Sequence, residues 1–182
     1  EVANLSEENL TGVSLSDENL ASTNLANANL TGKDLSGKDL SGKDLSGKDL
    51  SGKDLTFAKL TDANLSNAKL INAKLIGADL TNANLVDADL TNANLFGANL
   101  TNANLSKANL AGADLSDDYH RIPKLAGENP FGDYLPYENL DGADLTGADL
   151  SDANLTNAKI TGAKLDRAKL AGAKMPDGTI HD

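Results

Sequence analysis

The sequence of 182 residues contains no cysteine and no tryptophan, and aromatic residues make up only 3% of it. The absence of cysteine excludes disulfide bonds, thiolate metal ligands and a cysteine nucleophile. Ordinary globular cores rely on aromatic side chains for much of their buried area, so the core of this protein has to be built from other residues. No apolar run is long enough to span a bilayer.

Positive charge is also scarce, and the net charge is −11 at pH 7. An excess of carboxylates disfavours contacts with nucleic-acid phosphates and with an anionic membrane surface. We therefore expect neither direct nucleic-acid binding nor membrane insertion. No signal or transit segment is visible after Glu1. The expected location is the cytoplasm or, if a signal segment was removed, the periplasm or thylakoid lumen.

Leucine is abundant and strictly spaced. All 31 leucines lie at residue numbers divisible by five, from Leu5 to Leu170. An amphipathic helix needs apolar residues at i, i+3, i+4 and i+7, and a strand needs alternation by two. Neither element has a period of five, so a five-residue unit that turns a corner fits the pattern better.

The residues between the leucines indicate how each corner is made. The second residue after a leucine is almost always Gly, Asn or Asp, as in segment 80–85, which reads LTNANL. These residue types tolerate the positive φ that the third residue of a type II turn requires. The residue two before a leucine is alanine in twelve consecutive units, from Ala58 to Ala113, and in seven later units. Residues i and i+2 of an extended segment point the same way, so leucine and alanine should share the core.

This pattern resembles the signature of the pentapeptide-repeat family, Ala-(Asp/Asn)-Leu-x-x. The resemblance covers residues 4–117 and 138–175, and segment 78–85, ADLTNANL, is a plain example. It implies an all-β fold, a right-handed quadrilateral parallel β-helix with four pentapeptides per coil. On that count the chain forms about eight coils, a rod roughly 38 Å long at about 4.8 Å per layer. The ending 175–180, MPDGTI, is similar to the endings of small cyanobacterial members.

Residues 118–137 depart from the repeat. They hold three of the four prolines, which break the tight turns, and four of the six aromatic residues. We predict an inserted loop at 118–137, between a first part of the β-helix at 1–117 and the C-terminal coils and tail at 138–182. A degenerate coil is the alternative, because the segment has the length of one coil. Loops on rigid scaffolds often carry function, and the candidate partner-binding residues are Tyr119, His120, Arg121, Phe131, Tyr134 and Tyr137. The alternative is that these aromatic side chains only pack against the rod.

Charged residues interrupt the inward alanine position near the N-terminus. Lysine stands there in five successive units from Lys33 to Lys53, and Glu8 and Glu18 stand there earlier. A buried lysine is costly unless it is paired or extends its head to water. We expect the stems to line the corners and the ammonium groups to reach water or the neighbouring aspartates. A ring of lysines that binds an anion is the alternative, but the interleaved aspartates would cancel its field. Four further lysines should form an outward belt around the last coil: Lys159, Lys164, Lys169 and Lys174.

No motif indicates catalysis, a metal or a cofactor. Neither His120 nor His181 has a sequence partner that suggests a triad, and the glycines follow the turn period rather than a phosphate-binding motif. The sequence therefore predicts a non-enzymatic structural or protein-interaction solenoid with an unknown protein partner. A monomer is favoured over an end-to-end dimer.

The family resemblance implies one alternative function, since some members mimic DNA and act as inhibitors or protectors of DNA gyrase. Those members often carry phenylalanine at the central position of the repeat, whereas Phe57 and Phe96 occupy outward turn positions in this sequence. They also dimerise through a C-terminal module, and none is evident here. By a count of twenty residues per coil, four acidic residues fall on four different faces: Asp79, Asp87, Asp89 and Asp114. These features argue against the gyrase alternative.

Overall fold

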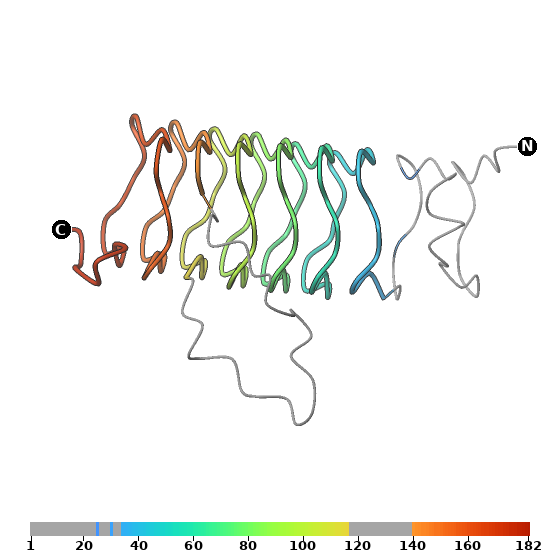
Figure 1. Ribbon diagram of the computed structural model, residues 1–182, viewed down its shortest axis with the longest axis horizontal. Coiled ribbons are helices and arrows are strands. Elements are labelled where there is room, and N and C mark those ends of the chain that lie inside the picture. Colours follow the sequence, from blue (N-terminus) through green and yellow to red (C-terminus); the bar gives the residue numbers. More distant parts are fainter. Residues whose placement is uncertain (1–24, 26–29, 31–33, 117–139) are drawn as a thin grey trace, which may run out of the picture.

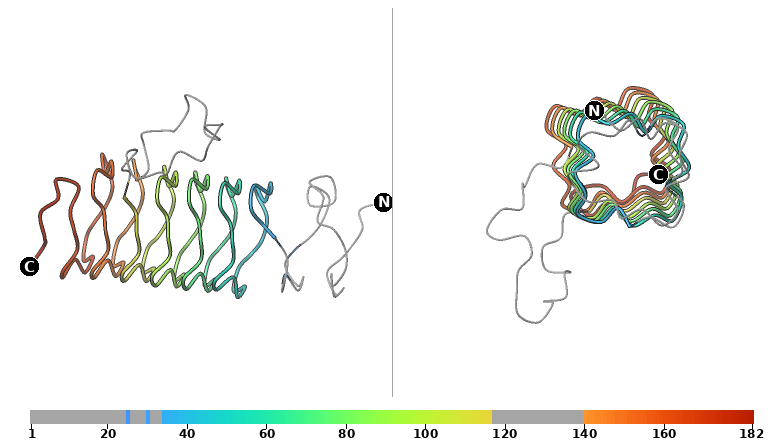
Figure 2. Two further views of the ribbon diagram at one scale, coloured as in Figure 1. Left: turned by 90° about the horizontal axis from the view of Figure 1, so that it is seen from below. Right: turned by 90° about the vertical axis from the view of Figure 1, so that its right-hand side faces the viewer.

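The computed structural model describes residues 25, 30, 34–116 and 140–182. These residues wind into a rod of stacked coils (Figure 1), and the coils superpose on a four-sided outline when viewed along the rod (Figure 2). The described backbone contains neither a helix nor a continuous strand. It consists of tight turns separated by single residues in β-bridges, all parallel except one at the C-terminal tail. The predicted fold, a right-handed parallel β-helix, is confirmed.

Each corner is a tight turn that begins at a leucine. At one corner the backbone N–H of Ala68 donates to the carbonyl oxygen of Leu65 at 3.0 Å. The third residue of that turn, Asn67, has a φ of 58°. The same combination recurs at the other corners, with glycine, asparagine or aspartate at most of the positive-φ positions. The predicted turn is therefore confirmed, and it explains why these residue types recur with a period of five.

Successive coils pair in parallel with a step of twenty residues. Asp79, for example, forms bridges to Lys59 in one neighbouring coil and to Asn99 in the other. The backbone N–H of Leu60 donates to the carbonyl oxygen of Asp79 at 2.7 Å, and the N–H of Asp79 donates to that of Ala58 at 3.0 Å. Equivalent bonds occur on all four sides of the internal coils and satisfy backbone groups that the core removes from water. Four pentapeptides per coil are thereby confirmed.

The core is a stack of leucine and alanine side chains. The described leucines from Leu25 to Leu155 are all buried, and the twelve inward alanines from Ala58 to Ala113 are at most 1% exposed. The inward assignment of both positions is therefore correct. Each coil buries its leucines only against the coils on either side, so stability comes from neighbouring layers, as in other solenoids.

The described coils have regular bounds. They comprise residues 35–54, 55–74, 75–94, 95–114, then 115–116 together with 140–154, and finally 155–174. After the last coil the tail turns back and Ile180 forms an antiparallel bridge with Lys174. The N–H of His181 donates to the carbonyl oxygen of Ala173 at 2.9 Å, so the tail pairs with one side of the last coil. The first units of the predicted eight coils lie outside the described residues.

Candidate interaction surface

The stack of coils continues directly from one side of residues 117–139 to the other. Asn104 pairs with Asp144, forty residues later, whereas the usual step is twenty. The N–H of Asp144 donates to the carbonyl oxygen of Ala103 at 2.9 Å, and the N–H of Leu105 donates to that of Asp144 at 2.7 Å. The coils on either side are therefore direct neighbours, with no layer between them.

The predicted site residues lie in the segment between these coils. All six fall outside the described residues, so their role stays a prediction, as does the loop boundary at 118–137: Tyr119, His120, Arg121, Phe131, Tyr134 and Tyr137. The structure does describe where this segment is attached. Ser116 is the last described residue before it and Leu140 is the first after it. Leu115 and Leu140 take consecutive corner positions of one coil.

Ser116, at the attachment point, is fully buried, and it is the single buried polar residue in the described part of the chain. Its Oγ donates to Asp114 Oδ1 at 2.5 Å, and its backbone N–H donates to the same oxygen at 3.1 Å. Its carbonyl oxygen accepts a hydrogen bond from the N–H of Gly97 at 3.0 Å. The attachment point is thus held to the coil by both backbone and side-chain bonds.

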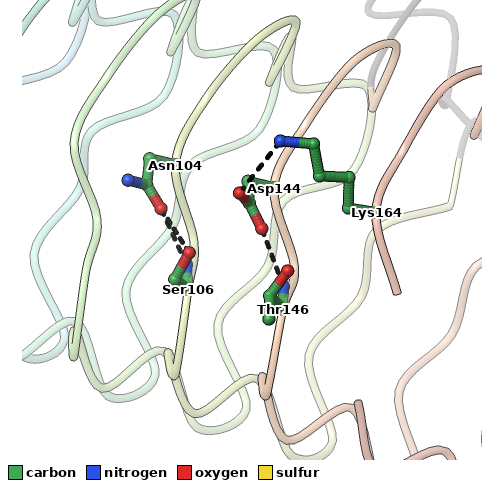
Figure 3. A network of polar contacts seen from close by, with 5 residues as sticks. All are labelled: Asn104, Ser106, Asp144, Thr146 and Lys164. Carbon is green, nitrogen blue, oxygen red and sulfur yellow. Dashed lines mark hydrogen bonds and ion pairs between the residues drawn. The ribbon is translucent and has the colours of Figure 1, made fainter. Parts of the chain in front are cut away.

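Polar contacts lie side by side in the successive coils at the junction (Figure 3). Asn104 Oδ1 accepts hydrogen bonds from the N–H and the Oγ of Ser106, at 3.0 and 2.7 Å. In the next layer Asp144 Oδ1 accepts from the N–H of Thr146 at 3.0 Å, and Asp144 Oδ2 lies 3.4 Å from Lys164 Nζ. The hydrogen bond from the Thr146 side chain is the largest cause of a lowered pKa at Asp144, and the charge of Lys164 adds to it.

The same polar arrangement recurs along the rod, so it is part of the repeat rather than a reactive centre. Asp149, for example, accepts from Ser151 Oγ at 2.6 Å and pairs with Lys169 Nζ at 3.1 Å. In the described part of the chain every buried side-chain nitrogen or oxygen has a hydrogen-bond partner. Nor do any three His, Asp or Glu side chains of these residues come together as a possible metal site.

Acidic side chains do not gather on one face of the described rod. Asp79, Asp89 and Asp114 belong to three separate rows of bridges, and Asp87 lies at a turn. Basic residues separate several of the aspartates, as where Lys59 Nζ lies 3.7 Å from Asp39 Oδ2. The predicted dispersal of charge is confirmed. The predicted basic belt is also present, since its four lysines are exposed around the last coil: Lys159, Lys164, Lys169 and Lys174.

Four lysines occupy the inward alanine position in coil 35–54. Lys38, Lys43, Lys48 and Lys53 are half-buried, whereas the alanines one coil later are fully buried. Burial lowers the pKa of Lys48, and the nearby charge of Asp44 partly opposes this shift. The prediction that the stems line the corners agrees with this partial burial. Lys33, Glu8 and Glu18 lie outside the described residues.

One corner carries large apolar side chains in place of polar ones. We call this the corner strip, and define it as the turn residues of three successive layers at that corner: Thr56, Phe57, Ile76, Gly77, Phe96 and Gly97. The N–H of Phe57 donates to the carbonyl oxygen of Ile76, and that of Gly77 to the carbonyl oxygen of Phe96, both at 2.9 Å. Gly97 continues this row of bonds to Ser116. The corner strip therefore ends one layer from the attachment point of residues 117–139.

The sequence analysis did not predict that Phe57, Ile76 and Phe96 lie at one corner of the rod. Phe57 and Phe96 were placed correctly at outward turn positions, and both are half-buried. Counting in steps of twenty would have located them, since Phe57, Gly77 and Gly97 form one series, and Ile76, Phe96 and Ser116 form the other. The signal lies in the coil period rather than in the five-residue motif.

Comparison with known proteins identifies the repeat. The family model for pentapeptide repeats matches in eight copies, over residues 3–42, 34–69, 49–87, 83–117 and 139–175. The chain belongs to the pentapeptide-repeat family. A comparison with curated proteins gives no significant match. In the described residues we find no helix with the length and apolar character needed to cross a membrane.

Several solved structures are similar to this chain. HetL, a pentapeptide repeat protein involved in heterocyst differentiation regulation from the cyanobacterium Nostoc sp. strain PCC 7120, is 33% identical; the match covers 87% of this chain and 81% of HetL, with a TM-score of 0.33. Rfr23 from the cyanobacterium Cyanothece 51142 is 27% identical over 79% of this chain and 91% of Rfr23, with a TM-score of 0.43. A pentapeptide repeat protein from the Arabidopsis thaliana thylakoid lumen is 26% identical over 78% of this chain and 71% of its own, with a TM-score of 0.35.

Proposed function

We propose that this protein is a non-enzymatic scaffold that binds a protein partner, and that residues 118–137 are its recognition element. The observation that carries the proposal is the direct pairing of Asn104 with Asp144. On three sides of the rod the described coils pair directly across this junction, without any contribution from the intervening residues. A segment that the scaffold does not need for its own pairing is free to be selected for binding.

The composition of the segment supports recognition of a protein. Aromatic residues and arginine are enriched at protein interfaces, and this segment holds Tyr119, Arg121, Phe131, Tyr134 and Tyr137 within twenty residues. The outward bridge residues of the coils that meet at the junction are instead regular polar side chains, such as Asn104 and Asp144, which hydrogen-bond within the repeat. The net charge of −11 favours a protein partner over a nucleic acid. We propose that the scaffold acts as a monomer, with no cofactor.

The test is a comparison of binding by three proteins: the full chain, a variant lacking residues 118–137, and a full-length variant in which the order of those residues is scrambled. Partners captured from an extract of the source organism are identified, purified and titrated against each protein by calorimetry. We expect a partner that binds the full chain and neither variant. Equal binding by all three proteins would place recognition on the rod and refute the proposal.

The gyrase alternative gains no support from the described residues, because their aspartates are spread over several rows. A supercoiling assay with titrated protein provides the check, and we expect no effect at micromolar excess.

A further inference from the structure

The last described coil, residues 155–174, presents a partly open β-edge. In the coil before it, the N–H of Leu145 donates to the carbonyl oxygen of Lys164 at 2.8 Å. The equivalent N–H groups of Leu165 and Leu170 have no backbone acceptor among the described residues. The side chains of Leu165 and Leu170 are half-buried, whereas that of Leu145 is fully buried. The edge therefore combines open backbone groups with an apolar surface, a combination that favours pairing with another chain.

The tail, residues 175–182, covers one of the four sides of this edge at the red end of the rod (Figure 1). The chain reverses at Gly178, whose φ is 84°. The tail then runs antiparallel to the last coil, where the N–H of Gly172 donates to the carbonyl oxygen of His181 at 2.8 Å. Ala173 on this side is fully buried. The inward alanines on two other sides of the same coil are only half-buried: Ala163 and Ala168. The tail thus takes the place of a further coil on its own side.

Lysine surrounds the edge. The outward position between the two inward residues of each side is lysine on all four sides of the last coil: Lys159, Lys164, Lys169 and Lys174. One layer earlier the described residues at this position are acidic or neutral: Asp144, Asp149 and Asn154. The side chains of Lys164 and Lys169 pair with aspartates of that layer, yet they remain 64% and 71% exposed. A belt of positive charge therefore rings the edge of a protein whose net charge is −11.

We propose that the basic belt and the tail together keep this end of the rod from pairing with a second copy of the protein. Pairing would bring the four lysines of one end to within about 4.8 Å of those of the other, well inside the Debye length of about 8 Å at physiological ionic strength. Lysine on an exposed edge is one of the features by which natural β-proteins avoid edge-to-edge association. The tail acts sterically, because it occupies the layer that a second copy would add on that side. The inference rests on one element of the proposed function, the monomeric state, and makes no use of residues 118–137.

A short extended segment of another protein is a weaker threat to this edge than a second copy. On the side of Lys164 the open groups are the N–H of Leu165 and the carbonyl oxygen of Ala163, and a corner follows at once. A strand in a protein sheet usually has about 5–6 residues, so such a side is too short to hold an extended segment by itself. A second copy has the same four-sided outline and can pair on several sides at once.

The test compares two variants of equal length and equal net charge, both lacking residues 177–182. In the belt variant three lysines of the last coil are replaced: Lys159→Asn, Lys169→Asn and Lys174→Asn. In the control variant the lysines of the same three rows in an internal coil are replaced: Lys59→Asn, Lys69→Asn and Lys74→Asn. Asparagine already occupies this position in other coils, as at Asn104, so it is compatible with the fold.

Sedimentation velocity over a series of protein concentrations measures the association of the full chain and of both variants. We expect the full chain to stay a monomer, and the belt variant to self-associate with a Kd at least about tenfold lower than that of the control variant, a difference of about 1.4 kcal/mol. A monomeric full chain with equal association of the two variants, or with none in either, overturns this proposal alone. A full chain that associates as readily as the belt variant overturns it together with the proposed monomeric state.

A second way of releasing the tail keeps the test valid if removal of residues 177–182 prevents folding. His181→Pro then replaces the truncation in both variants. The N–H of His181 donates to the carbonyl oxygen of Ala173 at 2.9 Å, and proline has no N–H to donate. Circular dichroism establishes that each variant is folded before the comparison. The expected result and the results that overturn the proposal are unchanged.

Discussion

Asn104 and Asp144 form one parallel β-bridge although forty residues separate them in the sequence. Away from this junction, every described parallel bridge joins residues that are twenty apart. The N–H of Asn154 likewise donates to the carbonyl oxygen of Ala113 at 2.9 Å, so the junction is closed on more than one side of the rod. On the three sides where both partners are described, the layers above and below the junction pair by the same bonds as the other layers.

This pairing predicts that residues 118–137 can be removed. The deletion joins Asp117 to Glu138 and restores a spacing of five between Leu115 and Leu140. We expect the variant to fold with a melting temperature equal to or above that of the full chain, because a shorter loop costs less closure entropy. Circular dichroism during heating provides the measurement. Glu138 would enter the inward position, so a second version with Glu138→Ala should be the more stable.

The control for this deletion removes residues 118–134, so it is three residues shorter than the deletion of 118–137. Leu115 and Leu140 would then be eight residues apart, so no regular corner could connect them. We expect this version to melt at a lower temperature than the twenty-residue deletion. Equal melting temperatures would show that the coil period places no constraint on the junction.

The repeat made most of the rod predictable from sequence. Positive φ at Asn67 follows from the turn geometry, which favours asparagine at that position. The burial of Ala68 follows from its place two residues before a leucine, where both side chains point into the core. The corner strip was not predicted, because it depends on residues twenty apart, such as Ile76 and Phe96. The five-residue motif carries no information on that scale.

Leu90 and Thr91 test the inward assignment at adjacent positions. Leu90 is fully buried, whereas Thr91 is half-buried and its Oγ1 donates to Asp89 Oδ1 at 2.5 Å. We expect Leu90→Ala to lower the free energy of unfolding by about 2–5 kcal/mol through lost burial and a cavity. Thr91→Ala should cost about 1 kcal/mol, the net contribution of a hydrogen bond. Urea unfolding measures both changes in stability. Equal midpoints for the two variants would contradict the assignment of Leu90 to the core and Thr91 to the surface.

Lys48 should destabilise the coil in which it lies. Its pKa is lowered chiefly by burial, so the folded protein holds this proton less tightly than the unfolded chain does. The charged form thus opposes folding at pH 7, and the penalty fades as the pH rises through the folded pKa toward 10.5. We expect Lys48→Ala to raise the free energy of unfolding at pH 7 by less than about 1 kcal/mol, because solvent screens the charge of this partly exposed group. The gain should shrink in alkaline buffer.

Lys59→Ala is the matched control for Lys48→Ala. The Lys59 side chain is 65% exposed and lies 3.7 Å from Asp39. Removing such an exposed ion pair should cost about 0–1 kcal/mol. A loss of stability in Lys48→Ala as large as that in Lys59→Ala would contradict the burial penalty.

Alanine substitutions at Gly97 and Gly112 distinguish the cost of backbone strain from the cost of steric overlap. Their φ values are 62° and 68°, so alanine at either position adopts a left-handed conformation that costs about 1–2 kcal/mol. A Cβ at Gly97 would meet nothing within 4 Å, whereas one at Gly112 would overlap Asn92 Oδ1. We expect Gly112→Ala to be the more destabilising, and Asn92→Ala to remove the difference. A double-mutant cycle without coupling between positions 92 and 112 would contradict this steric explanation.

Acid should weaken the rod through its outward aspartates. Hydrogen bonds from Thr146 and Ser151, together with two lysines, lower the pKa values of Asp144 and Asp149 below 3.8. The unfolded chain therefore binds these protons more tightly, and the resulting stability is present above about pH 5 and lost as the pH falls through the folded values. We expect the melting temperature to fall between pH 5 and pH 2 by that mechanism.

Replacement by asparagine tests this mechanism, since Asn104 accepts hydrogen bonds from Ser106 in the same geometry. The double variant Asp144→Asn, Asp149→Asn keeps both acceptors but has no carboxylate to titrate. At pH 7 it should lose only its exposed lysine pairs, about 0–1 kcal/mol each, and its loss of stability in acid should be shallower than that of the parent chain. Asp144→Ala, which removes the acceptor for Thr146, should cost about 1 kcal/mol at pH 7. A parent chain and asparagine variant with identical dependence on acid would show that these two carboxylates are not the groups whose protonation weakens the rod.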